Sequence, residues 1–305
     1  MNEQYLAIAR LMARIARNVF ADGVFALKGG TAINLFVRDL PRLSVDLDLV
    51  FIDHMLPREQ ALSAIGNALQ AIAERLKKLG LDVPAKRTGA AGDSYLYVRS
   101  GGVQVAIEVN EIVRGTLLAV QSRSLQPNAR ETLGVELELP VLAEPELYAG
   151  KLVAALDRQH PRDLFDVHQL FEAGGITAEM RRCFVAYLAS HNRPVHEVLA
   201  PRLQNISATF EGGFEGMTRD PVDLKTLLTA RERLIGEIRR GLTADERKFL
   251  LSLASAEPDW QLIGFSGLTD MPGPRWKLQN LQALARKNPA KFRAQLNRLE
   301  DLLSS

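Results

Sequence analysis

The chain has 305 residues, of which 47% are hydrophobic and 24% charged. This composition is typical of a globular protein and excludes a disordered or fibrous one, and the length suffices for two domains. One cysteine, Cys183, excludes an internal disulfide and a thiolate metal site and favours a reducing, cytoplasmic location. The net charge of +2 is too small to indicate a nucleic-acid partner by itself.

The N-terminal twenty residues superficially resemble a targeting peptide. Charged residues, such as Arg10 and Arg14, interrupt any apolar core that such a peptide would need. The spacing of the apolar residues instead predicts one face of an amphipathic helix: Leu6, Ala9, Ile15 and Val19. Since no apolar run approaches the roughly 18 residues of a membrane span, we expect a first helix of the fold and no membrane partner.

The predicted elements change in type along the chain. Apolar runs and period-two alternation predict short strands, with a hairpin turn at Gly101-Gly102 between the last two: residues 24–27, 45–51, 95–99 and 103–109. Helices are predicted at residues 32–38, from Pro57 to Gly80, and from Pro145 onward. The sequence therefore predicts an α/β fold, in which a small mixed-sheet domain, residues 1–140, precedes a mainly α-helical domain, residues 141–305.

Two local patterns refine the predicted helical half. Residues 211–222, rich in glycine and containing a proline, indicate a loop. Thr243 and Glu246 have the spacing of a capping box, which predicts the start of a further helix.

A Gly-Gly-Thr sequence follows the first predicted strand and opens a helix. At such a place, backbone N–H groups and the helix dipole can hold a phosphate, and glycine adds no steric obstruction. The candidate residues are Lys28, Gly29, Gly30 and Thr31. Taken alone, this tripeptide is more often an ordinary turn.

Two aspartates follow on the next predicted strand. Asp46 and Asp48 are two positions apart, so both point to one face of the strand while Leu47 and Leu49 point to the core. Adjacent carboxylates repel each other unless a cation or proton lies between them, and Mg²⁺ prefers such oxygen ligands. Glu108 becomes a third ligand if its strand lies near the pair. The alternatives are a solvated strand edge for the aspartates and an exposed strand position for Glu108.

The run LKGGTAINLFVRDLPRLSVDLDLVF resembles the signature of the AbiEii/AbiGii toxin family, a branch of the DNA polymerase β-like nucleotidyltransferases. The match includes the Lys-Gly-Gly-Thr sequence and Arg42-x-Ser44-x-Asp46-x-Asp48. The resemblance implies that residues 1–140 are a nucleotidyltransferase domain that uses Mg²⁺ or Mn²⁺. It also implies that the chain is the toxin of an abortive-infection pair, with a cognate antitoxin as partner.

The run KLVAALDRQHPRDLFDVHQL resembles a second motif of the same family, in which a lysine precedes Arg-Asp-x-x-Asp. The resemblance implies that Lys151 contacts the nucleotide phosphates and that Asp163 acts with it near the reacting centre, with Asp166 as a further candidate. The alternative is that Lys151 extends from an amphipathic helix while Arg162 and Asp166 form a surface ion pair.

The C-terminal region is helical and basic. Its segments FLLSLASAEPDW and PRWKLQNLQALARKNPAKF are similar to the terminal part of larger family members. No acidic residue interrupts its cations: Arg275, Lys277, Arg286, Lys287, Lys291, Arg293 and Arg298. Such a surface suits the phosphate backbone of RNA, although a solvated helix face is the more ordinary explanation of a run of charges. The rings of Trp276 and Phe292 are expected in the core.

These observations favour a toxin that transfers a nucleotide from an NTP to an RNA acceptor, tRNA in particular. In this hypothesis Asp46 and Asp48 hold metal, and Ser44 joins the Gly-Gly-Thr turn around the triphosphate. Two alternatives stay open. One is transfer to a small molecule, as in antibiotic nucleotidyltransferases. The other is a module that binds NTP or antitoxin and transfers nothing.

Overall fold

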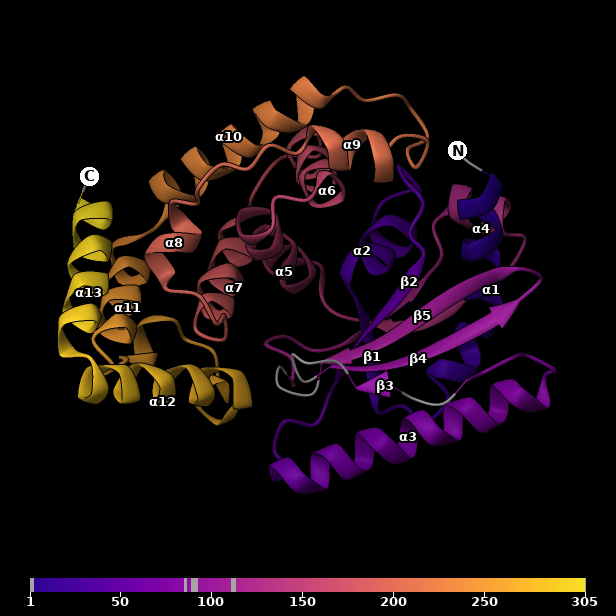
Figure 1. The fold of residues 1–305 in the computed structure, drawn as a ribbon, viewed down its shortest axis with the longest axis horizontal. Helices are drawn as coiled ribbons and strands as arrows, with labels where there is room; N and C mark the ends of the chain where they lie inside the picture. The colour runs from indigo at the N-terminus through magenta and orange to yellow at the C-terminus, as the bar shows by residue number, and fades with distance from the viewer. Residues whose placement is uncertain (1–2, 85–86, 89–92, 111–113, 305) are drawn as a thin grey trace. The chain divides into compact units, whose positions relative to one another are not determined.

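The computed structural model describes residues 3–84, 87–88, 93–110 and 114–304. The chain, coloured by residue number in Figure 1, divides into two compact units. The first unit comprises Met1–Leu147 and Glu215–Pro221, and the second comprises Tyr148–Phe214 and Val222–Ser305. The predicted assignment of functions to residues 1–140 and 141–305 stays a prediction.

The first unit contains a mixed sheet, as the sequence predicts. Within the described residues it has seven strands in the order β3-β4-β5-β2-β1-β7-β6. Their bounds are β1 Phe25–Lys28, β2 Asp46–Phe51, β3 Arg87–Thr88, β4 Asp93–Ser100, β5 Val103–Asn110, β6 Gln121–Ser124 and β7 Glu138–Val141. β2 pairs with β5 in parallel and β1 pairs with β7 in parallel, whereas the other pairs are antiparallel. The predicted hairpin between β4 and β5 is confirmed, because Ser100 pairs with Val103.

The helices of the first unit bury the apolar face of the sheet. They are α1 (Glu3–Val19), α2 (Gly29–Ala32), the π-helical turn η1 (Ile33–Val37), α3 (Arg58–Lys78) and α4 (Pro127–Leu133). α1 packs on β5 and on α3 (Figure 1). On β5, and at the start of β2, buried residues alternate with half-buried ones, and Leu47 and Ile107 are at most 1% exposed. Burial of this alternating apolar set fixes which residues project from the other face.

Within the described residues, the regular elements of the second unit are all helices. Its elements are α5 (Glu144–Asp157, with its first turn in the first unit), α6 (Pro161–Glu172), α7 (Ala178–Leu188), α8 (Val195–Leu199), α9 (Ser207–Gly213), α10 (Leu224–Gly241), α11 (Ala244–Ala254), the 3₁₀ turns η2 (Trp260–Leu262) and η3 (Leu268–Asp270), α12 (Pro272–Lys287) and α13 (Pro289–Ser304). The predicted capping box at Thr243 and Glu246 is confirmed. The loop predicted at 211–222 is wrong at its start, because α9 extends to Gly213.

Among the described residues, none of the helices combines the length and the apolar character needed to cross a membrane.

Candidate active site

The junction of β1 with α2, where the chain turns at Gly29-Gly30, is built around two close approaches. Gly29 has a φ of +75°, and a β-carbon placed on it would lie 2.0 Å from Asp48 Oδ2. A β-carbon on Gly30 would lie 2.7 Å from Arg42 Nη2 and 3.2 Å from Ser44 Oγ. Any larger residue at either position must displace these side chains. The Gly-Gly sequence thus brings the backbone of the turn against the side chains of the Arg42-x-Ser44-x-Asp46-x-Asp48 sequence.

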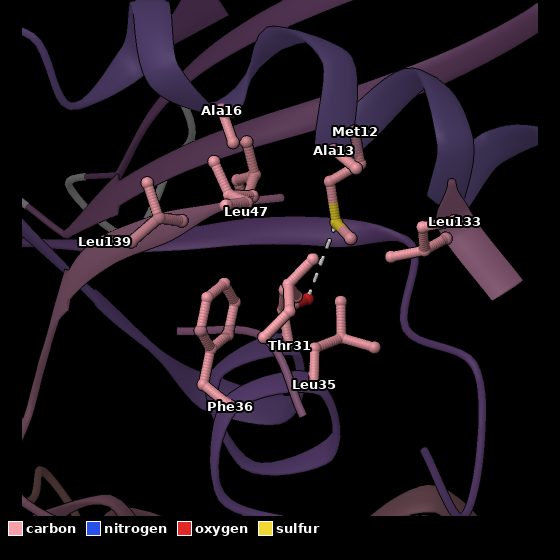
Figure 2. Close-up of a pocket in the computed structure, with 11 residues that line it drawn as sticks. Met12, Ala13, Ala16, Thr31, Leu35, Phe36, Leu47, Leu133 and Leu139 are labelled. Carbon is pink, nitrogen blue, oxygen red and sulfur yellow. Dashed lines mark hydrogen bonds between the residues drawn. The ribbon is translucent and has the colours of Figure 1, made fainter. Parts of the chain in front are cut away.

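Thr31 joins this turn to β2 from the core side. Its side chain is buried, with 2% exposure, and Figure 2 shows it among apolar side chains, close to the sulfur of Met12. Thr31 Oγ1 lies 2.9 Å from Ser44 Oγ and 2.5 Å from the carbonyl oxygen of Asp46. Because a hydroxyl has one proton, Thr31 donates to the carbonyl and accepts from Ser44. The threonine hydroxyl therefore orients β2, whereas its predicted contact with NTP stays a prediction.

The sheet register brings the predicted site residues into one row. Lys28 pairs with Asp48 across β1 and β2, and Asp48 pairs with Glu108 across β2 and β5. Asp46 pairs with Ala106 in the next row. Register partners project to the same face, so Glu108 does lie on a strand beside the aspartates, as its proposed role requires.

The donor chemistry of this row fits a hard divalent cation. Asp46, Asp48 and Glu108 offer only carboxylate oxygens, the ligands that Mg²⁺ and Mn²⁺ prefer. As their side chains are oriented, no group of three or more His, Cys, Asp or Glu residues within the described ranges forms a ready metal cluster. Metal binding by these residues stays a prediction.

A second cluster of charges lies in the second unit, around Lys151 on α5. Lys151 Nζ is 2.9 Å from Asp163 Oδ1 and 2.8 Å from Asp166 Oδ2, both on α6. Arg158 donates to both carboxylate oxygens of Asp163, at 2.6 and 3.0 Å. Lys151 and the two aspartates are buried. Asp166 is therefore not a solvated surface residue, since it is 1% exposed and lies within ion-pair distance of Lys151.

The two cations control the protonation of Asp163. Burial by itself raises the pKa of this carboxyl, but the charges and hydrogen bonds of Lys151 and Arg158 outweigh it and hold the pKa below its ordinary value. Asp163 is consequently an anion at neutral pH and a weak base. The geometry of Asp163 suits a role in orienting Lys151 and Arg158 better than a role as a general base.

The sequence analysis missed the residues that hold this cluster in place. Gln159, between α5 and α6, is 1% exposed and has a φ of +50°. Its amide donates to the Arg202 carbonyl at 2.8 Å and accepts from the Gln204 N–H at 3.0 Å and from Arg231 Nη1 at 3.1 Å. Arg158, which binds Asp163, directly precedes it. Neither periodicity nor a motif marks Gln159, because its partners come from distant parts of the chain.

The basic C-terminal region forms α12 and α13. All but one of the cations named above are exposed, and the exception is Lys277, which is 4% exposed. Lys277 Nζ donates to the carbonyls of His191 and Arg193, at 2.7 and 2.5 Å. The prediction that Trp276 lies in the core is wrong, since it is 37% exposed, and Phe292 is half-buried. α12 buries the side that carries Lys277 instead.

The comparisons with known proteins agree with the motifs. A family described as the nucleotidyl transferase AbiEii toxin, of type IV toxin–antitoxin systems, matches residues 10–280. The chain belongs to this family. It is therefore a nucleotidyltransferase toxin, and the resemblance seen in the sequence is confirmed.

A solved structure supports the fold. The nucleotidyltransferase toxin MenT4 from Mycobacterium tuberculosis H37Rv is 21% identical, with a TM-score of 0.58 over 81% of this chain and 87% of that one. Among curated proteins, none matches this chain.

Proposed function

We propose that this toxin transfers a nucleotide from an NTP to an RNA acceptor, tRNA in particular, with Mg²⁺ or Mn²⁺ as cofactor. The observation that carries the proposal is the row of Lys28, Asp48 and Glu108 beside the Gly29-Gly30 turn, in a chain that belongs to a nucleotidyltransferase family. The row has a cation at one end and carboxylates next to it, which suits a triphosphate held beside metal.

In this proposal Asp46, Asp48 and Glu108 hold the metal. When bound, the metal supplies positive charge that offsets the charge of the phosphates and of the leaving pyrophosphate. Lys28 and the backbone N–H groups of the Gly29-Gly30 turn contact the triphosphate. The missing side chains of the two glycines make room for Asp48, Arg42 and Ser44 beside this turn. Thr31 and Ser44 contribute to the same triphosphate-binding turn, with the Thr31 side chain acting from the core.

We assign Lys151 to the nucleotide phosphates and Asp163 to the positioning of Lys151. The two carboxylates hold the buried ammonium of Lys151 in one orientation, so it would meet a phosphate without reorienting. The charges of Lys151 and Arg158 balance those of Asp163 and Asp166. A triphosphate that reaches Lys151 therefore competes with carboxylates for the same N–H donors.

The proposed partners are an NTP, an RNA and a cognate antitoxin. The antitoxin follows from the type IV toxin–antitoxin class of the family. The RNA acceptor is supported by the exposed cations of α12 and α13, since a small acceptor needs no extended cationic surface.

The test is a transfer assay with each labelled NTP, Mg²⁺ and total cellular RNA. We expect label in a tRNA-sized band, and we expect it to disappear in an Asp48→Asn variant. Asp82→Asn, which changes an exposed aspartate of the same unit, is the matched control and should label RNA like the wild type.

Other results separate the alternatives. Label on protein or on a small molecule would agree with nucleotide transfer and overturn the proposal that the acceptor is RNA. NTP binding with no label on any acceptor overturns transfer and favours the binding module. Label that survives in excess EDTA overturns the metal requirement.

A further inference from the structure

Strand β4 carries two tyrosines on the sheet face that also carries the carboxylates. Tyr95 is the register partner of Glu108, and Tyr97 is the partner of Ala106. Glu108 is in turn the partner of Asp48. Because register partners on adjacent strands project to one side of a sheet, Tyr95 extends the row of carboxylates by one strand. At the ordinary strand spacing, Tyr95 is about 10 Å from Asp48.

The two tyrosine rings form a parallel, stacked pair. Their centroids are 6.3 Å apart and their planes differ by 8°. Both side chains are half-buried, whereas Ser94, Leu96 and Val98, on the opposite face of β4, are at most 1% exposed. β4 therefore has a closed face, with Ser94, Leu96 and Val98, and an opposite face that carries two half-buried parallel rings. The open side of such a strand ordinarily carries polar residues, so two parallel rings there favour a flat ligand.

The direction of the reaction decides which substrate lies on this side, and here the inference rests on the proposed function. The acceptor hydroxyl oxygen forms a bond to the α-phosphorus, and the bond from that phosphorus to the bridging oxygen breaks. Pyrophosphate leaves, and the hydroxyl proton passes to water. Attacking and leaving oxygens lie roughly in line. With the β- and γ-phosphates beside Lys28, at one end of the row, the acceptor approaches from the end where Tyr95 lies.

We propose that the Tyr95–Tyr97 ring pair is a stacking platform for the terminal base of a single-stranded RNA acceptor. Aromatic side chains on open sheet faces stack unpaired bases, and every base has a π-face that such rings accept. The platform would place the base beside the carboxylates and leave the hydroxyl of its ribose free to reach the NTP. It would also make the site tolerant of the identity of that base.

The test compares Tyr95→Leu and Tyr97→Leu with Tyr95→Phe and Tyr97→Phe. The leucine variants lose the ring, and the phenylalanine variants keep it. We expect the leucine variants to bind a short single-stranded RNA about 5- to 100-fold more weakly, with a matching rise in the KM for RNA. We expect the phenylalanine variants to bind within about twofold of the wild type, since stacking needs no hydroxyl. NTP affinity should not change in any variant.

Tyr5→Leu, at a half-buried tyrosine of α1, is the control for loss of a ring elsewhere and should leave RNA binding unchanged. Leucine variants that bind RNA as tightly as the wild type overturn the platform. So do variants that lose NTP affinity but keep RNA affinity, and so does a wild-type chain that binds no single-stranded RNA. Because the binding assay requires no turnover, a wild type that binds RNA but transfers no label overturns the proposed function and leaves the platform standing.

Discussion

The carboxylate of Asp48 lies directly against the α-carbon of Gly29. A β-carbon at Gly29 would be 2.0 Å from Asp48 Oδ2, closer than any non-bonded contact allows. The two residues are adjacent because Lys28, the residue before Gly29, is the register partner of Asp48. The position of the Asp48 carboxylate thus requires glycine at residue 29. This contact gives the first prediction.

Gly29→Ala should abolish most transfer activity. The added β-carbon displaces the Asp48 carboxylate, and a misplacement of this size costs about 100-fold in rate. Gly23→Ala is the matched control, because Gly23 also has a positive φ, +67°, but no atom within 4 Å of the added carbon. Both variants bear similar backbone strain, so only Gly29→Ala should lose activity in the transfer assay. Equal activity losses in the two variants would contradict this account.

Thr31→Val should lower stability and leave the KM for NTP unchanged. The valine keeps the volume of threonine but leaves the Asp46 carbonyl and the Ser44 hydroxyl without this partner, at a cost of about 1–3 kcal/mol. Urea unfolding measures the loss of stability, and Thr31→Ser, which keeps the hydroxyl, is the comparison. A large rise in the KM for NTP in Thr31→Val would instead assign the hydroxyl to the nucleotide.

Asp163→Asn should destabilise the protein at neutral pH and remove part of its acid sensitivity. Removing one partner of a buried ion pair costs about 3–5 kcal/mol. The folded-state pKa of Asp163 lies below its ordinary value of 3.8. Its stabilisation is therefore complete above pH 3.8 and decreases as the pH falls below it, because the unfolded chain binds the proton first.

Urea unfolding at pH 7 and at pH 3 measures this effect. The difference between the wild type and Asp163→Asn should shrink at the lower pH. The exposed Asp82→Asn should show no such difference at either pH. A gap between wild type and Asp163→Asn that is constant with pH would show that Lys151 and Arg158 do not depress this pKa.

Lys277 should make the protein more stable as the pH rises from 8 to 10.5. Burial lowers the pKa of this lysine from 10.5 to about 8. Within that window the unfolded chain binds more protons than the folded chain, so the free energy of unfolding increases with pH, by at most about 1.4 kcal/mol per pH unit. Unfolding of the wild type and Lys277→Met at pH 7.5 and 9.5 isolates this lysine. A variant with the same pH dependence as the wild type would contradict the prediction.

Neutralising the exposed cations of α12 and α13 should weaken RNA binding, and the loss of affinity should be largest at low salt. Each lost phosphate contact with single-stranded RNA should make the plot of log K against log salt shallower by about 0.7. The variant replaces Arg286, Lys287 and Lys291 with glutamine. Glutamine at Lys77 and Lys78, exposed on α3, is the control and should leave the slope unchanged.

Local patterns in the sequence determined much of this protein. The alternation of residues 45–51 places Asp46 and Asp48 on one face, because the side chains of a strand alternate whatever its neighbours are. The Gly101-Gly102 hairpin and the capping box at Thr243 likewise depend only on neighbouring residues. The family motifs carried the assignment to the nucleotidyltransferase toxins.

Only the tertiary structure decided which distant residues meet. Glu108 lies beside Asp48 because β5 pairs with β2 rather than with another strand, and that order depends on packing along the whole sheet. A lysine is ordinarily exposed and a tryptophan ordinarily buried, but on α12 Lys277 is buried and Trp276 is exposed. Lys277 can be buried because its ammonium donates to the carbonyls of His191 and Arg193. Local periodicity specifies the face of an element, whereas the partner on that face is set by long-range packing and hydrogen bonding.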